Sequence, residues 1–359
     1  MVVDESLKAW LTLSLTRGLG GTGARRLLKE FGSPEAVLSA SIASLKSLVN
    51  ADVAAQLGQG MNEEALVPTL AWLEDDNNGI LTLADANYPK ALFNIPDPPL
   101  LLYVKGRQEL LNANSLAIVG SRHATPQGIG NAEAFAESLS QAGLCIISGM
   151  AHGIDAAAHR GALRAQGSSI AVVGTGLDKV YPSANRDLAH QLARQGALIS
   201  EFALGTPPIA SNFPRRNRLI SGISLGTLIV EASLQSGSLI TARMAMEQGH
   251  DVFAIPGSIH SPLSRGCHKL IKQGAKLAET AQDILDELAV QLAPMQPSPD
   301  IVSEIYPSLI EKMGFDPVDM DTLCARTGLT VSQLSAMLLT LELEGRIATL
   351  PGGLFQRTH

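Results

Sequence analysis

Several short stretches of this sequence are rich in glycine, in basic side chains or in both. Glycine lets a backbone come within hydrogen-bonding distance of a phosphate, and a helix that starts beside it adds unpaired N–H groups and a favourable dipole. Each stretch follows an apolar run, and the stretches are residues 120–122, 148–155, 174–182, 212–218 and 235–241. The basic side chains within them are Arg122, Lys179, Arg215, Arg216 and Arg218. A single nucleotide needs one or two phosphate sites, whereas several adjoining sites suit a nucleic-acid strand.

Two aromatic side chains stand beside these basic residues. Tyr181 and Phe213 could stack on bases, which is worth roughly 1–3 kcal/mol per base in single-strand binders, or could wedge their loops against the sheet. Because only 4% of the residues are aromatic, we expect binding to depend mostly on phosphates. Arg122 could hold one phosphate bidentately at the start of a helix, or could pair internally with Asp155 or Asp178.

A parallel β-sheet must hold these stretches. From residue 115 onward, amphipathic segments alternate with short apolar runs at 116–119, 144–147, 169–173, 197–200, 227–232 and 251–256. This alternation predicts an α/β fold with a Rossmann-like doubly wound parallel sheet. The carboxyl ends of its strands share one edge, so the five stretches should form one continuous groove. Left-handed helix ends are expected at Gly143, Gly167, Gly196, Gly249 and Gly274.

Segments of different composition flank the predicted sheet. The expected order is a helical module of the SAM or helix-hairpin-helix type at 1–75, an extended lead-in at 76–114, the Rossmann-like domain at 115–290, a linker at 291–300 and a winged-helix domain at 301–359. In the first module, the GLG at 18–20 could hold a DNA phosphate or allow tight helix packing. The second helix of the winged-helix domain contains no Lys or Arg, which favours protein contact over DNA reading.

Charge and composition limit the class of protein. The 359 residues carry a formal net charge of −7, but residues 115–280 hold 14 Lys and Arg against 10 Asp and Glu. This asymmetry suits an anionic partner and also lies within ordinary surface variation. A hydrophobic content of 45% excludes a disordered or fibrous chain. Since no leader or membrane span is evident and the three cysteines are dispersed, we expect a cytoplasmic protein without membrane insertion.

The sequence gives little support to cofactor or catalytic chemistry. A dinucleotide site would place GxGxxG after the first strand and an acid at the end of the second, whereas Gly120 precedes Ser-Arg and the second strand ends in Ser148-Gly149. His152 and His159 lack a third metal ligand. No Ser-His-Asp order or paired carboxylate set is evident. We therefore predict a binding protein with no cofactor, no metal and no catalytic residue.

Taken in order, the loop motifs resemble the DNA-processing protein A family, also called DprA or Smf. The motifs lie within residues 85–280 and are NYP, DPP, VGSR, SGMAHGID, GTGLDKVYP, FPRRNRLISG, VEASLQSGSLITA and AIPGS. The resemblance implies a single-stranded DNA-binding recombination mediator that protects incoming DNA and loads the RecA recombinase during natural transformation and homologous recombination, as a homodimer. With the loop pattern, it implies a DNA site made of Gly120, Ser121, Arg122, Gly149, Gly153, Lys179, Tyr181, Phe213, Arg215, Arg216, Asn217, Arg218, Gly237 and Ser238.

The sequence is also compatible with two other functions. The stretch SLGTLIVE at 224–231 is similar to the PGGxGTxxE loop of nucleotide phosphoribohydrolases, whose glutamate, here Glu231, serves ribose binding and catalysis. Ile223 and Ser224 replace the paired glycines of that loop. A protein scaffold without a polynucleotide site is the other alternative. Release of free base from nucleoside monophosphates would indicate the enzyme, and a lack of any mobility shift with oligonucleotides would indicate the scaffold.

Overall fold

The protein folds into two compact units, Met1–Leu292 and Ala293–His359. A computed structural model describes residues 5–60, 63–165, 168–288, 309–310, 312–314, 316–343, 346–350 and 354–357. The predicted linker at 291–300 and the first residues of the predicted winged-helix domain lie outside the described residues. Among the residues that are described, no helix combines the length and the apolar character needed to cross a bilayer.

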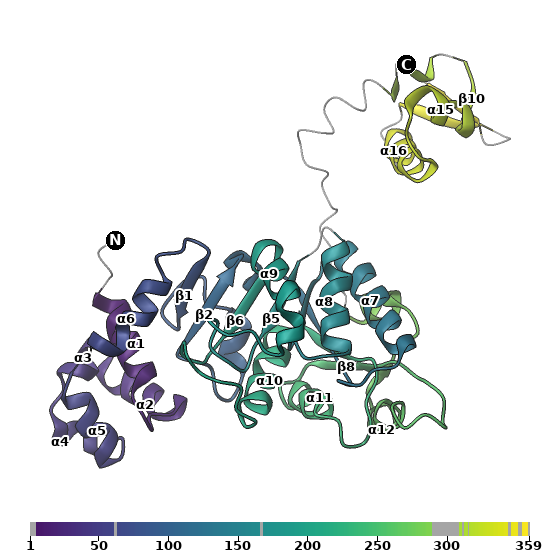
Figure 1. The fold of residues 1–359 in the computed structure, drawn as a ribbon. Helices are drawn as coiled ribbons and strands as arrows, with labels where there is room; N and C mark the ends of the chain where they lie inside the picture. Colours follow the sequence, from purple (N-terminus) through teal and green to yellow (C-terminus); the bar gives the residue numbers. More distant parts are fainter. Residues whose placement is uncertain are drawn as a thin grey trace. The chain divides into compact units, whose positions relative to one another are not determined.

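A nine-stranded sheet forms the centre of the first unit (Figure 1), in the order β1-β2-β6-β5-β4-β3-β7-β8-β9. The strands are β1 (Asn78–Thr82), β2 (Leu101–Gly106), β3 (Ser115–Val119), β4 (Cys145–Ser148), β5 (Ser169–Val172), β6 (Ala197–Ser200), β7 (Gly226–Ile229), β8 (Asp251–Ala254) and β9 (Lys276–Leu277). Strands β3 to β9 are parallel, so the predicted Rossmann-like sheet is confirmed. The expected lead-in contributes β1 and β2, which pair antiparallel at the edge beside β6.

Helices cover both faces of this sheet. The sheet-domain helices are α7 (Pro126–Gln141), α8 (Ile154–Arg164), α9 (Arg186–Gln195), α10 (Asn212–Ile223), α11 (Ser238–Glu247), α12 (Arg265–Lys272) and α13 (Ala281–Leu288). Helices α7, α8 and α9 cover one face, and α10, α11 and α12 cover the other (Figure 1). Side chains of α13 pack with those of α7 and α8 on the first face. The chain runs outward from β3 to β6 and returns through α10 to β7, beside β3. The strand order therefore reverses between β3 and β7, where open α/β sheets bind ligands.

Of the predicted glycine helix ends that the structure describes, three are left-handed and one is not, and the prediction at Gly167 lies outside the described residues. Gly143, Gly249 and Gly274 have φ of 93°, 79° and 102°. Gly196 has φ of −133°, so the prediction of a left-handed residue is wrong there. A Cβ at Gly196 would lie 2.1 Å from the carbonyl oxygen of Ser169, so glycine is required for close packing of the chain instead.

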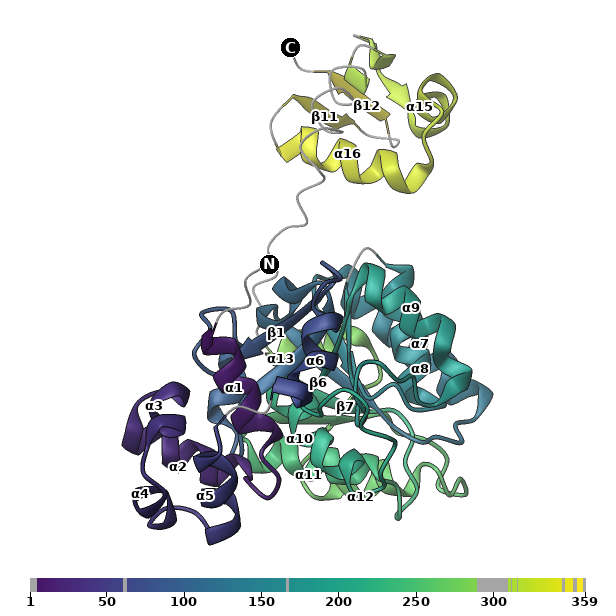
Figure 2. The ribbon, with the colours of Figure 1, turned by 60° about the vertical axis from the view of Figure 1, so that its left-hand side comes forward.

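Short helices precede the sheet and pack beside its β1–β2 edge (Figure 2). They are α1 (Glu5–Leu15), α2 (Gly21–Phe31), α3 (Pro34–Ser39), α4 (Ile42–Lys46), α5 (Ala51–Gly58) and α6 (Glu63–Trp72). Elsewhere in the first unit, short 3₁₀ helices occur at η1 (Lys90–Asn94), η2 (Gln108–Asn112) and η3 (Ser183–Asn185). The start of α2 meets the segment before β2: a Cβ on Gly21 would lie 2.6 Å from Oδ1 of Asp97. Arg25 donates to the same oxygen over 2.9 Å. These contacts involve Gly21 and not the glycines of the predicted hairpin at 18–20, since nothing lies within 4 Å of a Cβ at Gly20. Both alternatives for the hairpin glycines therefore stay predictions.

The second unit has winged-helix architecture, as predicted. Strands β10 (Val318–Asp319), β12 (Leu354–Arg357) and β11 (Ile347–Leu350) form a sheet in that order, with α15 (Met320–Thr327) and α16 (Val331–Leu343) beside it. Asp319 caps α15 by accepting from the Thr322 N–H over 2.8 Å. Gly328 ends α15 in the left-handed region at φ 74°. Leu323, Leu334 and Leu338 are buried in its core.

Candidate nucleic-acid interface

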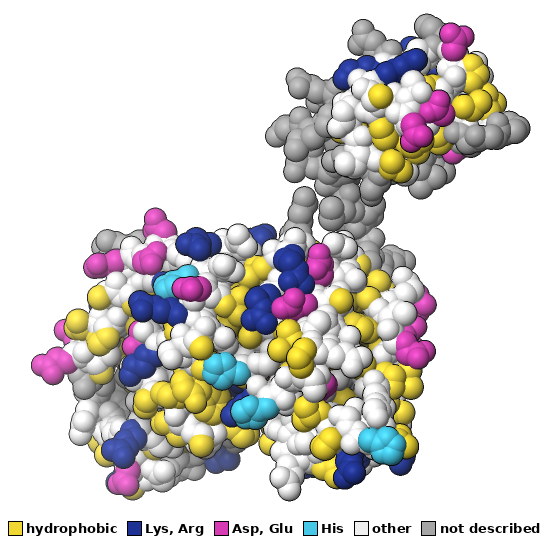
Figure 3. All heavy atoms as spheres, turned by 45° about the vertical axis from the view of Figure 1, so that its right-hand side comes forward, with side chains coloured by type: hydrophobic (Ala, Val, Ile, Leu, Met, Phe, Trp, Pro, Cys, Tyr) yellow, Lys and Arg dark blue, Asp and Glu magenta, His cyan; other side chains and the backbone are white. Residues whose placement is uncertain are grey.

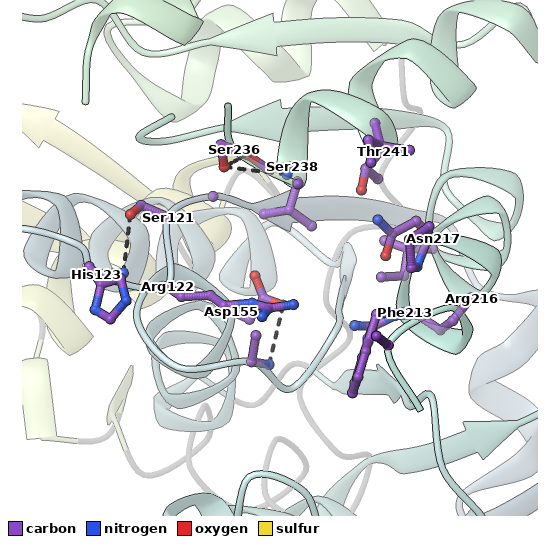
Figure 4. A pocket seen from close by; sticks show the side chains of 18 of the residues that line it. Ser121, Arg122, His123, Asp155, Phe213, Arg216, Asn217, Ser236, Ser238 and Thr241 are labelled. Carbon is purple, nitrogen blue, oxygen red and sulfur yellow. Dashed lines mark hydrogen bonds between the residues drawn. The ribbon is translucent and has the colours of Figure 1, made fainter. Parts of the chain in front are cut away.

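A pocket of about 610 Å³ opens at the carboxyl edge of the sheet, where the strand order reverses between β3 and β7. We call it the switch-point pocket. Its walls come from the loop after β3, the start of α8, the loop before η3, the first half of α10 and the start of α11. The sequence-predicted residues that line it are Gly120, Ser121, Arg122, Tyr181, Phe213, Arg216, Asn217, Gly237 and Ser238. Figure 4 labels six of them, which are Ser121, Arg122, Phe213, Arg216, Asn217 and Ser238.

Close contacts between neighbouring loops fix the wall after β3. The Ser121 N–H donates to the carbonyl of Glu231 over 2.8 Å, and the Ile154 N–H donates to the Ser121 carbonyl over 3.2 Å. Gly153 has φ of +74°, and a Cβ there would lie 2.3 Å from the Ser121 oxygen. Gly153 is not among the residues that line the pocket. Its lack of a side chain allows the loop after β4 to pack against the loop after β3, which forms the wall.

Arg122 is exposed at the mouth of the pocket beside two aromatic rings. Its guanidinium carbon lies 5.7 Å from the centre of the Phe213 ring, and the Phe213 and Tyr181 ring centres are 5.6 Å apart. Within the described part of the chain, no ion pair of 4 Å or less joins Arg122 to Asp155 or Asp178. The alternative of an internal ion pair is therefore not what the structure shows. A guanidinium on an aromatic face keeps its donors available to an anion.

Arg216 lies beneath the pocket rather than at its mouth. Its side chain is buried, and Nη1 donates to the carbonyl oxygens of Gly149 and Val172. A Cβ on Gly149 would lie 2.3 Å from that nitrogen, which explains the glycine at the end of β4. Burial lowers the pKa of Arg216 to about 10, against the opposing effect of the Asp155 carboxylate. Arg216 stays charged at neutral pH and holds the loop between β4 and α8 in place.

Asp155 is the acidic group in the pocket lining, and it faces inward. Its Oδ2 accepts from the Gly149 N–H at 3.1 Å and from the Ala151 N–H at 3.3 Å. Burial raises the pKa of this carboxyl, and the nearby Arg216 guanidinium and the two N–H groups oppose the rise. Because the Asp155 carboxylate accepts hydrogen bonds from its own loop, it caps the turn before α8. Arg122, and not Asp155, is exposed at the mouth of the pocket.

The wall opposite Arg122 is neutral and rich in hydroxyl groups. It starts at the N-terminus of α11, where the hydroxyls of Ser236 and Ser238 lie 2.7 Å apart (Figure 4). The Ser236 hydroxyl also accepts from the Ser238 N–H over 3.4 Å. Thr241 lies one turn further along α11 and also lines the pocket, although it is almost fully buried. Ser236 and Thr241 lie in the predicted stretch 235–241 but were not among the predicted site residues. His123 and Ser233 were missed altogether. The signal for Thr241 was its spacing of three from Ser238, which places both on one helix face.

Three predicted basic residues do not line this pocket. Lys179 is exposed, and its Nζ donates to the Gly205 carbonyl over 2.7 Å. Arg215 and Arg218 both pair with Glu201, at 3.1 and 2.7 Å. These two arginines project from the opposite side of α10, so the helix divides the single continuous groove that the sequence suggested. On the face shown in Figure 3, basic and acidic side chains are interspersed and form no uniform basic patch.

Glu231 has a structural contact that bears on the enzyme alternative. Its carboxylate accepts from the Thr125 N–H over 2.9 Å and from the Thr125 hydroxyl over 2.6 Å. A Cβ on Gly128 would lie 2.3 Å from the Glu231 carboxyl carbon. Glu231 therefore holds the start of α7 and is not among the residues that line the pocket.

Comparisons with known proteins agree with this architecture. The sequence profile described as DNA recombination-mediator protein A matches residues 79–289, and the DprA winged helix domain profile matches residues 293–353. Protein Smf of Escherichia coli is 43% identical over 300 residues, which are 81% of this chain and 80% of that protein. The DNA processing protein DprA of Streptococcus pneumoniae is 47% identical over 206 residues, covering 57% and 73% of the two chains.

Solved structures give the same result. The X-ray structure of DprA from Streptococcus pneumoniae matches with a TM-score of 0.70 and 37% identity, covering 78% of this chain and 97% of that one. DNA processing protein A from Helicobacter pylori, whose structure is described as giving insight into a single-stranded DNA binding mode, matches with a TM-score of 0.54 and 32% identity over 58% and 95% of the two chains. This chain belongs to the DNA recombination-mediator protein A family, as the order of its loop motifs implied.

Proposed function

We propose that this protein binds single-stranded DNA at the switch-point pocket and acts as a recombination mediator that protects the strand and loads RecA on it. The observation that carries the proposal is the combination of an exposed arginine, two aromatic rings and a wall rich in hydroxyl groups around one concave site. Arginine recognises phosphate, and aromatic faces recognise unpaired bases. The relative from Helicobacter pylori supports the same ligand class.

A concave site of this kind suits a single strand better than a duplex. In a duplex the bases face each other inside the helix, so they are not available to Phe213 and Tyr181. An unpaired base can reach those rings while its phosphate reaches Arg122. Because the recognised features are shared by all nucleotides, we expect little sequence preference.

The RecA partner and the homodimer enter this proposal from the family resemblance. Both are open to direct measurement. Light scattering of the full chain should give the mass of two copies. A DNA-coated column should retain RecA more strongly when this protein is bound to the strand than when it is absent.

The proposed role is binding without turnover. A phosphoribohydrolase needs its glutamate at the ribose, whereas Glu231 accepts two hydrogen bonds from Thr125 and does not line the pocket. Incubation with nucleoside monophosphates, followed by chromatography for free base, should give no release above the rate without protein. Release that depends on Glu231 would replace the proposed function with the enzyme.

The direct test is a titration of a fluorescent single-stranded oligonucleotide, followed by anisotropy. We expect saturable binding by the full chain and a clear loss with Arg122→Ala. Saturable binding that is unchanged by this substitution would show that the strand binds elsewhere. No change in anisotropy at any protein concentration would indicate the scaffold alternative.

A further inference from the structure

A second pocket, of about 200 Å³, lies across α10 from the switch-point pocket. We call it the hinge-side pocket, because the N-terminal helices and the sheet domain both form its walls. The N-terminal side is supplied by the turn before α2, at Gly20 and Gly21. The sheet side is supplied by the segment after β6 and by the outer face of α10, at Phe202, Arg215 and Arg218.

Ion pairs join the charged side chains of this pocket. Glu201 is buried, with 3% of its side chain exposed, and pairs with both Arg215 and Arg218. Asp97 lies 3.6 Å from Arg218 and 2.9 Å from Arg25, which is not among the lining residues. The lining therefore holds two arginines and two carboxylates, and both carboxylates are already paired.

Arg215 is the residue of this set that is most accessible to a ligand. Its side chain is 51% exposed, whereas that of Arg218 is 11% exposed. Arg215 also lies over the Phe202 ring, with the guanidinium carbon 5.7 Å from the ring centre. The pair repeats the arrangement of Arg122 and Phe213 in the switch-point pocket. Both pockets thus combine an exposed guanidinium with an aromatic face, the two features that hold single-stranded nucleic acid.

The geometry of α10 places the two pockets close enough for one strand. Successive residues of an α-helix are separated by about 100°, so Phe213 and Asn217 share one face while Arg215 and Arg218 share another. The pockets are therefore separated by about one helix diameter, roughly 10 Å. The N-terminal helices are fixed at this position because Arg25 donates to Asp97 and to the Pro98 carbonyl, each over 2.9 Å.

We propose that the hinge-side pocket is a second nucleotide subsite for the same DNA strand. In this arrangement Arg215 contacts a phosphodiester of the segment next to the one in the switch-point pocket, and a base of that segment stacks on Phe202. The N-terminal helices complete the subsite through the turn at Gly20 and Gly21. This inference rests on the proposed function, since it needs the strand to occupy the switch-point pocket first.

The test compares oligothymidylates of about three and about six nucleotides, which fill one pocket or reach both. Wild-type full chain should bind the longer strand more tightly. Arg215→Ala should leave the affinity for the short strand within twofold and weaken the long strand about tenfold, which is 1.4 kcal/mol. Phe202→Leu keeps an apolar side chain in place and should weaken the long strand about fivefold. Arg160→Ala is the matched control, because Arg160 is also a half-exposed arginine paired with a glutamate, on the outer face of α8.

Each outcome decides between this subsite and a purely structural ion-pair cluster. If Arg215→Ala and Phe202→Leu leave the gain from three to six nucleotides unchanged, the subsite is refuted. The same holds if both lengths are weakened equally, as a general loss of fold or charge would do. Failure of the wild-type chain to bind either strand, or equal binding by Arg122→Ala, would refute the proposed function itself rather than the second subsite.

Discussion

The guanidinium of Arg122, on the loop after β3, lies over the ring of Phe213, at the start of α10, with 5.7 Å between the guanidinium carbon and the ring centre. This contact joins the two walls of the switch-point pocket. It holds the arginine side chain beside an aromatic surface without using its hydrogen-bond donors. In the proposed function, this arrangement lets the pocket hold a phosphate and a base at the same time.

Arg122→Ala should weaken single-stranded DNA binding by about 1.5–3 kcal/mol, the range for a hydrogen bond to a charged group. Anisotropy titrations would measure the loss. Because Arg122 is exposed and forms no ion pair within the described residues, the melting temperature should stay within experimental error of wild type. Unfolding of the variant with binding retained would mean that Arg122 serves the fold instead.

Salt should weaken the complex steeply, because the proposed contacts are mostly with phosphates. For single strands, log K should fall by about 0.7 units per neutralised phosphate for each log unit of salt. Titrations at four or five sodium chloride concentrations give the slope. Arg122→Ala should reduce its magnitude by about the amount expected for one phosphate. A slope near zero for the wild-type chain would contradict phosphate-based binding.

Gly153→Ala should destabilise the sheet domain by about 1–3 kcal/mol, because the new Cβ would meet the Ser121 oxygen at 2.3 Å in a backbone at φ +74°. Urea unfolding would measure the change. DNA affinity should fall as well, since Ser121 belongs to the pocket wall. Gly130→Ala is the control, because nothing lies within 4 Å of a Cβ there. Equal stability of the two variants would disprove the supporting role of Gly153.

Stability should fall with acid because of His159. This side chain is fully buried, and its Nδ1 lies 2.7 Å from the Ser169 hydroxyl. Burial lowers its pKa from 6.5 to about 3. Below pH 6.5, His159 is therefore protonated in the unfolded chain but stays neutral in the folded chain. The free energy of unfolding keeps its full value above pH 6.5 and declines below it. The decline from His159 should reach about 1.4 kcal/mol per pH unit.

Urea unfolding of wild type between pH 5 and 6.5 would measure this slope, above the range in which carboxyl groups dominate. His159→Gln removes the titrating group and keeps hydrogen-bonding capacity, so its slope should be smaller by most of that amount. An unchanged slope in the variant would assign the acid sensitivity to other groups.

Glu231→Ala should lower stability by about 1–3 kcal/mol, since Thr125 would lose the acceptor of two hydrogen bonds at the start of α7. Thermal unfolding of Glu231→Ala and of the control Glu247→Ala, which removes an exposed glutamate, would measure the difference in stability between the two variants. Binding of DNA by the folded fraction of Glu231→Ala should persist. Full stability of Glu231→Ala would mean that the contact with Thr125 contributes nothing to the fold.

The sheet and the pocket at its carboxyl edge could be predicted because their signals are local. Apolar runs and glycine loops recur at short range, and the topology of a parallel sheet brings the ends of its strands together. The assignment of Arg122 to the pocket mouth followed from its place directly after β3. Gly120 and Gly237 were located by the same reasoning.

What the sequence did not show depends on contacts between distant segments. The run of arginines at 215–218 gave no sign that Arg216 would be buried under Gly149 or that Arg218 would meet Glu201 and Asp97. Those partners are set by the packing of α10 on the sheet and on the N-terminal helices. For the same reason the lead-in was not recognised as two strands, since β2 finds its partner in β6 across the sheet.

The most direct test of single-strand binding in the switch-point pocket is a competition experiment. Unlabelled single-stranded and duplex oligonucleotides of equal length would compete for the full chain against a labelled single strand at one salt concentration. The pocket geometry predicts that the single strand competes at least tenfold better, and that Arg122→Ala removes most of this advantage. Equal competition by the duplex, or an advantage that survives Arg122→Ala, would contradict it.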